Sequence, residues 1–280
     1  MVSRSDYGER EVEACRSVLL ELVHILGEFK DHMIIIGGWV PAFLFPRAED
    51  CHIGSLDIDV ALDFKEIPDD SYQTILTALL KNSYVQDQRQ PFRFYRKVKT
   101  LDDSEITVEI DLMAGEYGGT GKGRRTQKVQ NARARKARGC DLAFTDSITV
   151  AFEGGRPEGR RDRTSFQVAG IVPFLVMKGM ALFDRMKEKD AYDIYYCIEH
   201  FAGGPEALAE KFTPSLKNSL VQEGLSKIRS KFASVGHIGP KWVADFLEIS
   251  DKEERKIVIR RAYEKAAELL DLIGVKEWGR

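Results

Sequence analysis

The sequence predicts an α/β protein of the α+β type, in which a small mixed sheet flanked by helices is followed by a helical C-terminal half. Short stretches with the period-two alternation of β-strands occur in the first 165 residues, and helix-periodic stretches separate them. After residue 166 the strand signals fade and the helical period continues. We therefore divide the chain into a core with an N-terminal helix, residues 1–165, and a helical domain, residues 166–280.

The predicted elements of the core follow the order helix, strand, helix, strand, helix, strand, strand. Their ranges are a helix at 11–29, a strand at 32–38, a helix from 39, a strand at 56–62, a helix at 71–85, and strands at 92–99 and 106–115. The last two strands are expected to pair through a turn at residues 101–104. In the C-terminal half, the stretch 174–201 is expected to form one helix.

Composition limits the class of protein. With 280 residues, of which 43% are hydrophobic, the chain is long enough to bury one large core or two modest ones. Its four cysteines lie far apart and form no CxxC pair, which argues against a zinc site. Together with the absence of a signal-peptide pattern, they favour a location in the reducing cytoplasm. The longest apolar runs are shorter than the roughly 20 residues of a membrane-spanning helix, so no membrane partner is expected.

Two aspartates interrupt the strand at 56–62. Asp57 and Asp59 share one face, about 7 Å apart at a rise of about 3.3 Å per residue. The pair indicates either an exposed strand with a solvated acidic face or a site for a divalent cation, Mg²⁺ or Mn²⁺. If the strand at 106–113 lies alongside, Asp111 can approach both aspartates, and three converging carboxylates would favour the cation.

Gly37 and Gly38 lie where the first strand gives way to a helix. Glycine lets the backbone approach a ligand closely, and a helix N-terminus presents N–H groups to an anion such as phosphate. A plain tight turn explains the same pair.

A charged segment interrupts the C-terminal helical pattern. Lys178 lies within the apolar run "FLVMKGMALF", where a lysine either extends to the surface or meets an anion. Together with Arg185 and Lys189 it could bring positive charge to a triphosphate. Asp190 and Asp193, three residues apart, could instead pair with Arg185 or Lys189 on a solvated helix face.

The glycine pair opening a helix, the D-x-D on the next strand and the third Asp on a neighbouring strand resemble the polymerase-beta-like nucleotidyltransferase superfamily. More specifically, "GGW…HIGSLDIDV" and "KGMALFDRMKEKDAYDIY" are similar to AbiEii/AbiGii-type nucleotidyltransferases, many of which are toxins of toxin–antitoxin systems. The similar region covers residues 30–198.

The resemblance implies transfer of a nucleoside monophosphate from an NTP to a hydroxyl, with Mg²⁺ (or Mn²⁺) as cofactor and release of pyrophosphate. It implies metal ligands at Asp57, Asp59 and Asp111, nucleotide contacts at Gly37, Gly38, Ser55, Lys178 and Arg185, and catalytic roles for Asp57, Asp59, Asp111, Lys178 and Asp193. The helical domain would thus contribute Lys178 and Asp193 to the site. His52 stands where the family often has Arg, and no role is assigned to it.

A basic block at 121–139 suggests the acceptor. No acid occurs from residue 118 to 139, and the block contains Lys122, Arg124, Arg125, Lys128, Arg133, Arg135, Lys136 and Arg138. Such a block favours a phosphate backbone, and we expect RNA, most plausibly a tRNA 3′ end as in some relatives. A solvated loop, or a surface that anchors an acidic antitoxin, would have the same composition. A small-molecule or protein acceptor, or an inactive binding module, also stays open.

Overall fold

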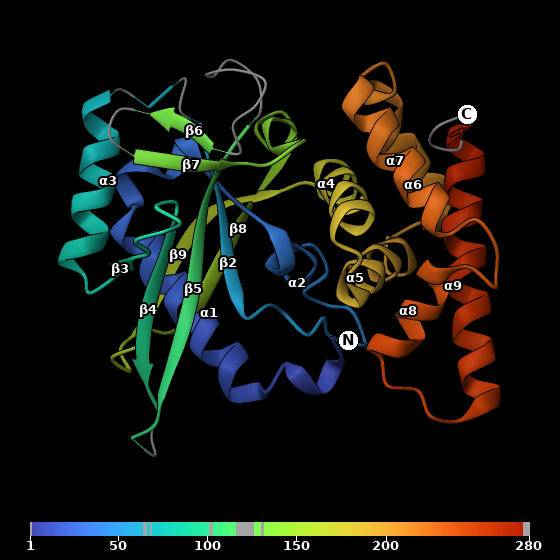
Figure 1. The fold of residues 1–280 in the computed structure, drawn as a ribbon, viewed down its shortest axis with the longest axis horizontal. Coiled ribbons are helices and arrows are strands. Elements are labelled where there is room, and N and C mark those ends of the chain that lie inside the picture. The colour runs from blue at the N-terminus through green and yellow to red at the C-terminus, as the bar shows by residue number, and fades with distance from the viewer. Residues whose placement is uncertain are drawn as a thin grey trace. The chain divides into compact units, whose positions relative to one another are not determined.

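The computed structural model describes residues 2–63, 66–67, 69–100, 103–115, 126–129 and 132–276 (Figure 1). The chain forms two compact units. The first, here called the sheet unit, comprises Gly8–Phe43 and Gly54–Gly170. The second, the helical unit, comprises Met1–Tyr7, Leu44–Ile53 and Ile171–Arg280. Dividing the sequence after residue 165 does not anticipate the two short N-terminal segments that belong to the helical unit.

The sheet unit is built on one mixed sheet, as predicted, which has nine strands in the described part of the chain. Its main order is β3-β4-β5-β2-β1-β9-β8, and β7 joins the end of β5 and pairs with β6. β2 and β5, β1 and β9, and β5 and β7 are parallel, whereas the other neighbours are antiparallel. The strands are β1 (Met33–Ile36), β2 (Asp57–Leu62), β3 (Val85–Gln86), β4 (Arg93–Lys99), β5 (Glu105–Ala114), β6 (Thr126–Val129), β7 (Ala132–Lys136), β8 (Ser147–Gly155) and β9 (Arg161–Ala169).

Helix α1 (Glu9–Ile25) covers the apolar face of this sheet and contacts β2, β4, β5, β8 and β9. The alternation of β2 sends Ile58 and Val60 to one face, where both are fully buried. Burial of an aliphatic side chain of this kind contributes about 1.5–3 kcal/mol. Glu21 of α1 bonds to Arg96 of β4 at 2.8 and 2.9 Å, which places α1 on the face of Arg96. The odd-numbered residues of β2, including Asp57 and Asp59, therefore lie on the opposite face.

Shorter helices complete the sheet unit. They are α2 (Val40–Leu44), α3 (Asp69–Lys81) and the 3-10 helices η2 (Gly27–His32), η3 (Gly37–Trp39) and η4 (Cys140–Phe144). The indole Nε1–H of Trp39 donates to Cys15 Sγ at 3.3 Å, which fixes the turn after β1 against α1. In Figure 1, α3 flanks the β3 edge.

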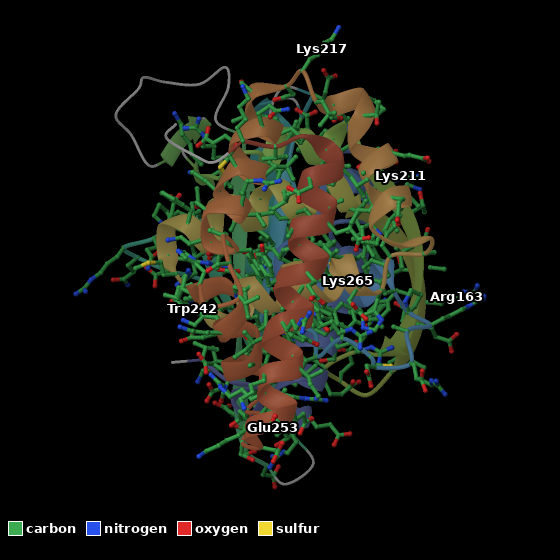
Figure 2. All side chains as sticks on the ribbon, turned by 90° about the vertical axis from the view of Figure 1, so that its right-hand side faces the viewer. Arg163, Lys211, Lys217, Trp242, Glu253 and Lys265 are labelled. Atoms are coloured by element: carbon green, nitrogen blue, oxygen red, sulfur yellow. The ribbon has the colours of Figure 1, made fainter. Side chains whose placement is uncertain are left out.

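The helical unit confirms the predicted helical C-terminal half. Its helices are α4 (Ile171–Arg185), α5 (Glu188–Glu199), α6 (Gly204–Phe212), α7 (Ser219–Lys231), α8 (Ile238–Phe246) and α9 (Lys252–Ile273), with the 3-10 helices η1 (Arg4–Asp6) and η5 (Thr213–Ser215). α4 and α7 cross closely because Gly179 faces Gly224, and a Cβ on Gly179 would overlap with the Gly224 carbonyl oxygen. Figure 2 shows charged side chains such as Lys211, Lys217 and Glu253 on the outside of this unit.

The two N-terminal segments of the helical unit are held by aromatic packing. Tyr192, Tyr196 and Phe246 form a buried cluster between α5 and α8. Tyr7 and Phe45 pack against this cluster, with ring centroids 5.7 Å from Phe246 and 6.0 Å from Tyr196 respectively. The segment 44–53 therefore belongs to the helical unit although it lies between two strands in the sequence.

Two local predictions are wrong. The expected single helix at 174–201 is two helices, because Met186 adopts a left-handed φ of 49° and Lys187 is extended. The hairpins β6–β7 and β8–β9 were not predicted, so the sheet is larger than expected. None of the described helices is both long and apolar enough to span a membrane.

Candidate functional site

Carboxylates of β2 and β5 form two rows on the face of the sheet opposite α1. β2 and β5 are parallel neighbours, with Asp57 opposite Glu109 and Asp59 opposite Asp111. Neighbouring strands lie about 4.8 Å apart, so these side chains occupy adjacent positions. This confirms the expectation that the strand bearing Asp111 lies beside the strand bearing Asp57 and Asp59. Asp57 is exposed and Asp59 half-buried, whereas the side chain of Asp111 is only 6% exposed.

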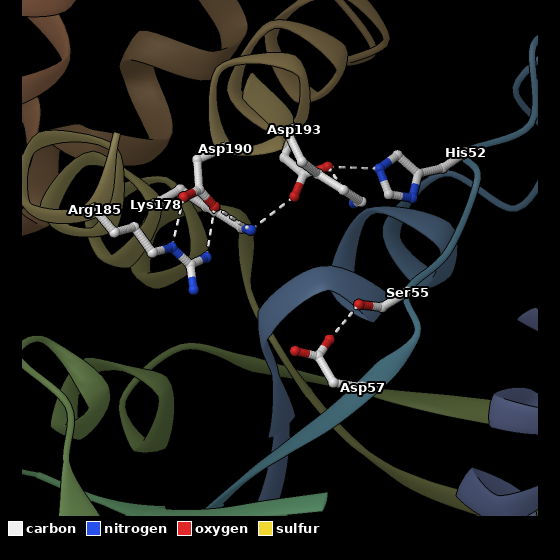
Figure 3. Close-up of polar contacts among 8 residues, drawn as sticks. His52, Ser55, Asp57, Lys178, Arg185, Asp190 and Asp193 are labelled. Carbon is white, nitrogen blue, oxygen red and sulfur yellow. Dashed lines mark hydrogen bonds and ion pairs between the residues drawn. The ribbon is translucent and has the colours of Figure 1, made fainter. Parts of the chain in front are cut away.

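Ser55 fixes the orientation of Asp57. Its hydroxyl donates a 2.6 Å hydrogen bond to Asp57 Oδ1, and the serine itself is buried (Figure 3). The bond leaves Oδ2 of the same carboxylate pointing in a defined direction. Ser55 therefore acts on Asp57 in this structure, and its predicted contact with nucleotide phosphate stays a prediction.

Gly37 allows Asp59 to lie close to the turn after β1. Its φ is +73°, a conformation that L side chains rarely adopt, and a Cβ there would overlap with Oδ2 of Asp59. The neighbouring Gly38 is buried in η3. The glycine at position 37 thus makes room for a carboxylate, and the predicted phosphate contact of the pair stays a prediction.

Arg93 of β4 engages both carboxylates of β5. Its Nε and Nη2 donate to Asp111 Oδ1 and Oδ2 at 2.8 and 2.9 Å, and its Nη2 lies 2.7 Å from Glu109 Oε1. This bidentate pairing raises the pKa of Arg93 above its usual range. Burial raises the pKa of Glu109, and the charges of Asp111 and Asp57 add to this effect against that of Arg93. The face is therefore crowded with negative charge despite the arginine.

Arg93 was not among the predicted site residues, although the hairpin register points to it. Lys99 and Glu105 form the last pair before the turn. Arg93 lies six residues before Lys99, and Asp111 lies six residues after Glu105. An antiparallel hairpin must therefore place Arg93 opposite Asp111.

Part of the basic block adjoins the same face. β7 pairs with β5 at Met113 and Arg135, and Nη1 of Arg135 lies 3.6 Å from Asp111 Oδ2. Lys136 is half-buried, while Arg138 is exposed. Lys128 and Arg133 are paired across the β6–β7 hairpin, where the structure describes their backbone alone. Arg124 and Arg125 lie outside the described residues.

In the helical unit, Lys178 and Asp193 belong to a buried ionic network (Figure 3). Lys178 Nζ lies 2.8 Å from Asp190 Oδ1 and 2.7 Å from Asp193 Oδ2, and Lys189 Nζ lies 2.7 Å from Asp193 Oδ1. Burial acts to raise the pKa of Asp193, but Lys178 and Lys189 outweigh it and hold this pKa well below its usual range. The side chain of Asp193 has no exposed surface. The anion that Lys178 meets in this structure is thus a pair of carboxylates of its own unit.

Arg185 and His52 complete this network. Arg185 makes a bidentate pair with Asp190, both bonds being 2.7 Å long, and its side chain is 46% exposed. His52 Nε2 lies 2.9 Å from Asp193 Oδ1. Burial, with the positive charge of Lys189, lowers the pKa of His52 to about 4. The histidine is therefore neutral near pH 7 and donates its Nε2–H to the carboxylate. Three cations then face two carboxylates, and the network carries a net charge of about +1.

The residues of the sheet unit fit a divalent cation in part. Asp57 and Asp59 offer hard oxygen ligands on one accessible face, and Mg²⁺ is commonly held by one or two carboxylates, water and substrate phosphates. Among the described residues, no group of three His, Cys, Asp or Glu side chains is arranged to hold a metal. The donor set therefore fits an ion shared between Asp57, Asp59 and a bound phosphate.

No family model and no curated protein matches the chain. Among solved structures, it is similar to the crystal structure of an antigenic nucleotidyltransferase-like protein from Paracoccidioides brasiliensis, with 14% identity and a TM-score of 0.45. The similarity covers 80% of this chain and 89% of that chain. At this level it establishes neither a shared activity nor shared site residues.

Proposed function

We propose that this protein is a Mg²⁺-dependent nucleotidyltransferase that transfers a nucleoside monophosphate from an NTP to a hydroxyl of RNA. The observation that carries the proposal is the pair Asp57 and Asp59. Both lie on the polar face of β2, one oriented by Ser55 and the other fitted against Gly37. Two oriented carboxylates beside a glycine turn suit a cation that also binds phosphate.

In the proposed reaction a hydroxyl oxygen of the acceptor bonds to the α-phosphorus, and the bond from that phosphorus to the bridging oxygen breaks. Pyrophosphate leaves, and the hydroxyl proton passes to solvent water. A Mg²⁺ ion would polarise the phosphate oxygens. Asp57 and Asp59 would hold this ion. Asp111 would orient the acceptor hydroxyl, because the two hydrogen bonds from Arg93 hold its carboxylate in a fixed position.

The resemblance implies that Lys178 and Arg185 bring positive charge to the triphosphate. Arg185 is the most accessible member of its network, because it is half exposed while Lys178 is buried between two carboxylates. The resemblance implies that Lys178 and Asp193 are required for catalysis. We propose that they serve chiefly by holding Arg185 and α5 in position.

RNA is the proposed acceptor because β7 brings Arg135 beside the carboxylate face. Lys136 and Arg138 follow on the same segment, so phosphates of a polynucleotide could be bound near the reacting hydroxyl. A tRNA 3′ end, and a role as the toxin of a toxin–antitoxin pair with a protein antitoxin, rest on the resemblance to AbiEii/AbiGii-type enzymes.

The test is label transfer. The protein is incubated with Mg²⁺, total tRNA and each α-labelled NTP in turn, alongside Asp57→Asn and the control Glu105→Gln. Glu105 lies at the other end of β5 in an exposed pair with Lys97, so its substitution removes the same charge about 20 Å from Asp111. Label on RNA with the wild type and the control, but not with Asp57→Asn, supports the proposal. Label on the protein or on a small acceptor would replace RNA as the acceptor, and no pyrophosphate release under any condition would overturn the activity.

A further inference from the structure

We infer that Asp111 is not a ligand of the catalytic cation, and that the guanidinium of Arg93 takes the place of a cation beside it. This inference rests on the proposed function and deepens it. It departs from the three-carboxylate metal site that the sequence predicts, because it restricts the cation to Asp57 and Asp59 and makes Arg93 a positioning residue for Asp111.

The strand register places the three groups in one row. Asp59 on β2 lies opposite Asp111 on β5, and Asp111 lies opposite Arg93 on β4. Asp111 therefore has a carboxylate on one side and a guanidinium on the other. Since the three positions are fixed by backbone hydrogen bonds of a sheet, the arrangement does not depend on a single side-chain rotamer.

The contacts of Asp111 are those of an arginine-bound carboxylate. Both of its oxygens accept a hydrogen bond from Arg93, at 2.8 and 2.9 Å, and Arg135 approaches Oδ2 at 3.6 Å. The side chain is also nearly buried. A divalent cation that bound Asp111 would have to share these oxygens with two positive groups, and like charges at such distances repel strongly.

The net charge around Asp111 also indicates that this face binds a single divalent cation. Among the described residues, the strand positions next to Asp111 on this face carry four carboxylates, on Asp57, Asp59, Glu109 and Asp111, and two guanidinium groups, on Arg93 and Arg135. Four negative and two positive charges leave a net charge of about −2, which a single divalent cation neutralises. A second cation on the protein alone would leave the face positive.

The experiment measures binding of Mn²⁺ to the full chain without nucleotide, by the electron paramagnetic resonance signal of the free ion. We expect one Mn²⁺ per wild-type chain and at least tenfold weaker binding in Asp59→Asn. Arg93→Met should create a second site or tighten binding at least tenfold, while Arg93→Lys should not. Lys97→Met, which removes a positive charge from the same face of the same strand, is the control and should behave as wild type.

A double variant separates ligation from charge. Arg93→Met combined with Asp111→Asn leaves the net charge of the face unchanged, so its Mn²⁺ affinity should stay within threefold of wild type. A tenfold loss in this variant, or two ions bound by the wild type, would overturn the inference while leaving the proposed function in place. If neither wild type nor any variant binds Mn²⁺, and added NTP does not change this, the proposed cation site fails and the inference with it. Circular dichroism of each variant confirms that the fold is retained.

Discussion

His52 donates a hydrogen bond to Asp193 in the interior of the helical unit, with Nε2 and Oδ1 2.9 Å apart. The imidazole is also stacked on Tyr192, with ring centroids 5.5 Å apart, and meets the edge of Tyr196 at 4.8 Å. A protonated imidazole would be buried here beside Lys189, which is why the pKa of His52 falls to about 4. The histidine is thus a neutral donor that ties the segment 44–53 to α5.

This contact predicts a loss of stability in mild acid. In the unfolded chain the pKa of histidine is about 6.5, so the unfolded state binds more protons between about pH 6.5 and 4, and stability falls as pH falls through that range. The contribution of Asp193 acts in a lower window, because its depressed pKa stabilises the fold until the pH drops below about 4. Between pH 7 and 4.5, we expect the wild type to lose roughly 2 kcal/mol more than His52→Gln, which keeps an N–H donor but does not titrate. Urea unfolding of both proteins at the two pH values measures the difference, and parallel losses would show that His52 is protonated in the folded state.

A second prediction concerns Lys178 as a structural counterion. Lys178→Met leaves Asp190 and Asp193 buried with fewer cationic partners, and removing one partner of such a pair costs about 3–5 kcal/mol. Arg185→Met should cost about 1 kcal/mol or less, because Arg185 is half exposed and Asp190 keeps Lys178. Urea unfolding at pH 7 compares the two. If Lys178→Met unfolds at the wild-type urea concentration but no longer binds NTP, Lys178 acts on phosphate rather than on the two carboxylates.

The sequence revealed the charges of this network and left open that Asp190 and Asp193 pair with Arg185 or Lys189, but it did not indicate that both aspartates are buried. The apolar neighbours of Lys178 indicate a lysine that either extends to the surface or meets an anion, and the resemblance implies that the anion is a nucleotide phosphate. In this structure the anion is the pair of carboxylates on Asp190 and Asp193. The break between α4 and α5 settles the geometry, since it lets Asp190 and Asp193 turn back toward Lys178. Neither glycine nor proline marks the break, because the left-handed residue is Met186, so periodicity alone predicted one helix.

In the sheet, the sequence predicted the arrangement of the charged residues better than it did in the helical unit. Alternation placed β2, β4 and β5 correctly, and with them the carboxylate rows, because one buried face imposes a period of two on these strands. The hairpin β8–β9 was missed although Val150 and Phe152 alternate with the smaller or polar residues Thr149, Ala151 and Glu153 and the turn contains Pro157 and Gly159. Its residues are mostly exposed or half-buried, which weakens the hydrophobic pattern. Pairing of β7 with β5 is a long-range contact, and local sequence does not specify such contacts.

A third prediction tests the fit between Gly37 and Asp59. Gly37→Ala imposes a left-handed conformation on alanine, which costs about 1–2 kcal/mol, and its methyl group would displace the Asp59 carboxylate. We expect at least tenfold weaker Mn²⁺ binding and loss of nucleotidyl transfer in a folded protein. Gly27→Ala is the matched control, because no atom lies within 4 Å of the added methyl group. Unchanged Mn²⁺ affinity in Gly37→Ala would mean that Asp59 does not need its observed position to bind the ion.

The last prediction concerns the basic segment after β6. If Arg135, Lys136 and Arg138 contact phosphates, replacing all three with alanine removes up to three ionic contacts, and the slope of log K against log salt should fall by about 2 for a single-stranded acceptor. The control removes the same number of charges from the other hairpin, where Arg160 precedes β9 and Arg161 and Arg163 lie at its start. All three are exposed, and Figure 2 shows Arg163 at the surface. Fluorescence anisotropy with labelled tRNA between 50 and 200 mM salt is the measurement. The control should keep the wild-type slope, because its arginines are not expected to contact phosphate. Nonspecific attraction to net charge would instead lower the slope of both triple variants alike. A common decrease would therefore show that RNA senses the charge of the whole protein, whereas a decrease confined to the β7 variant would place the phosphates next to Asp111.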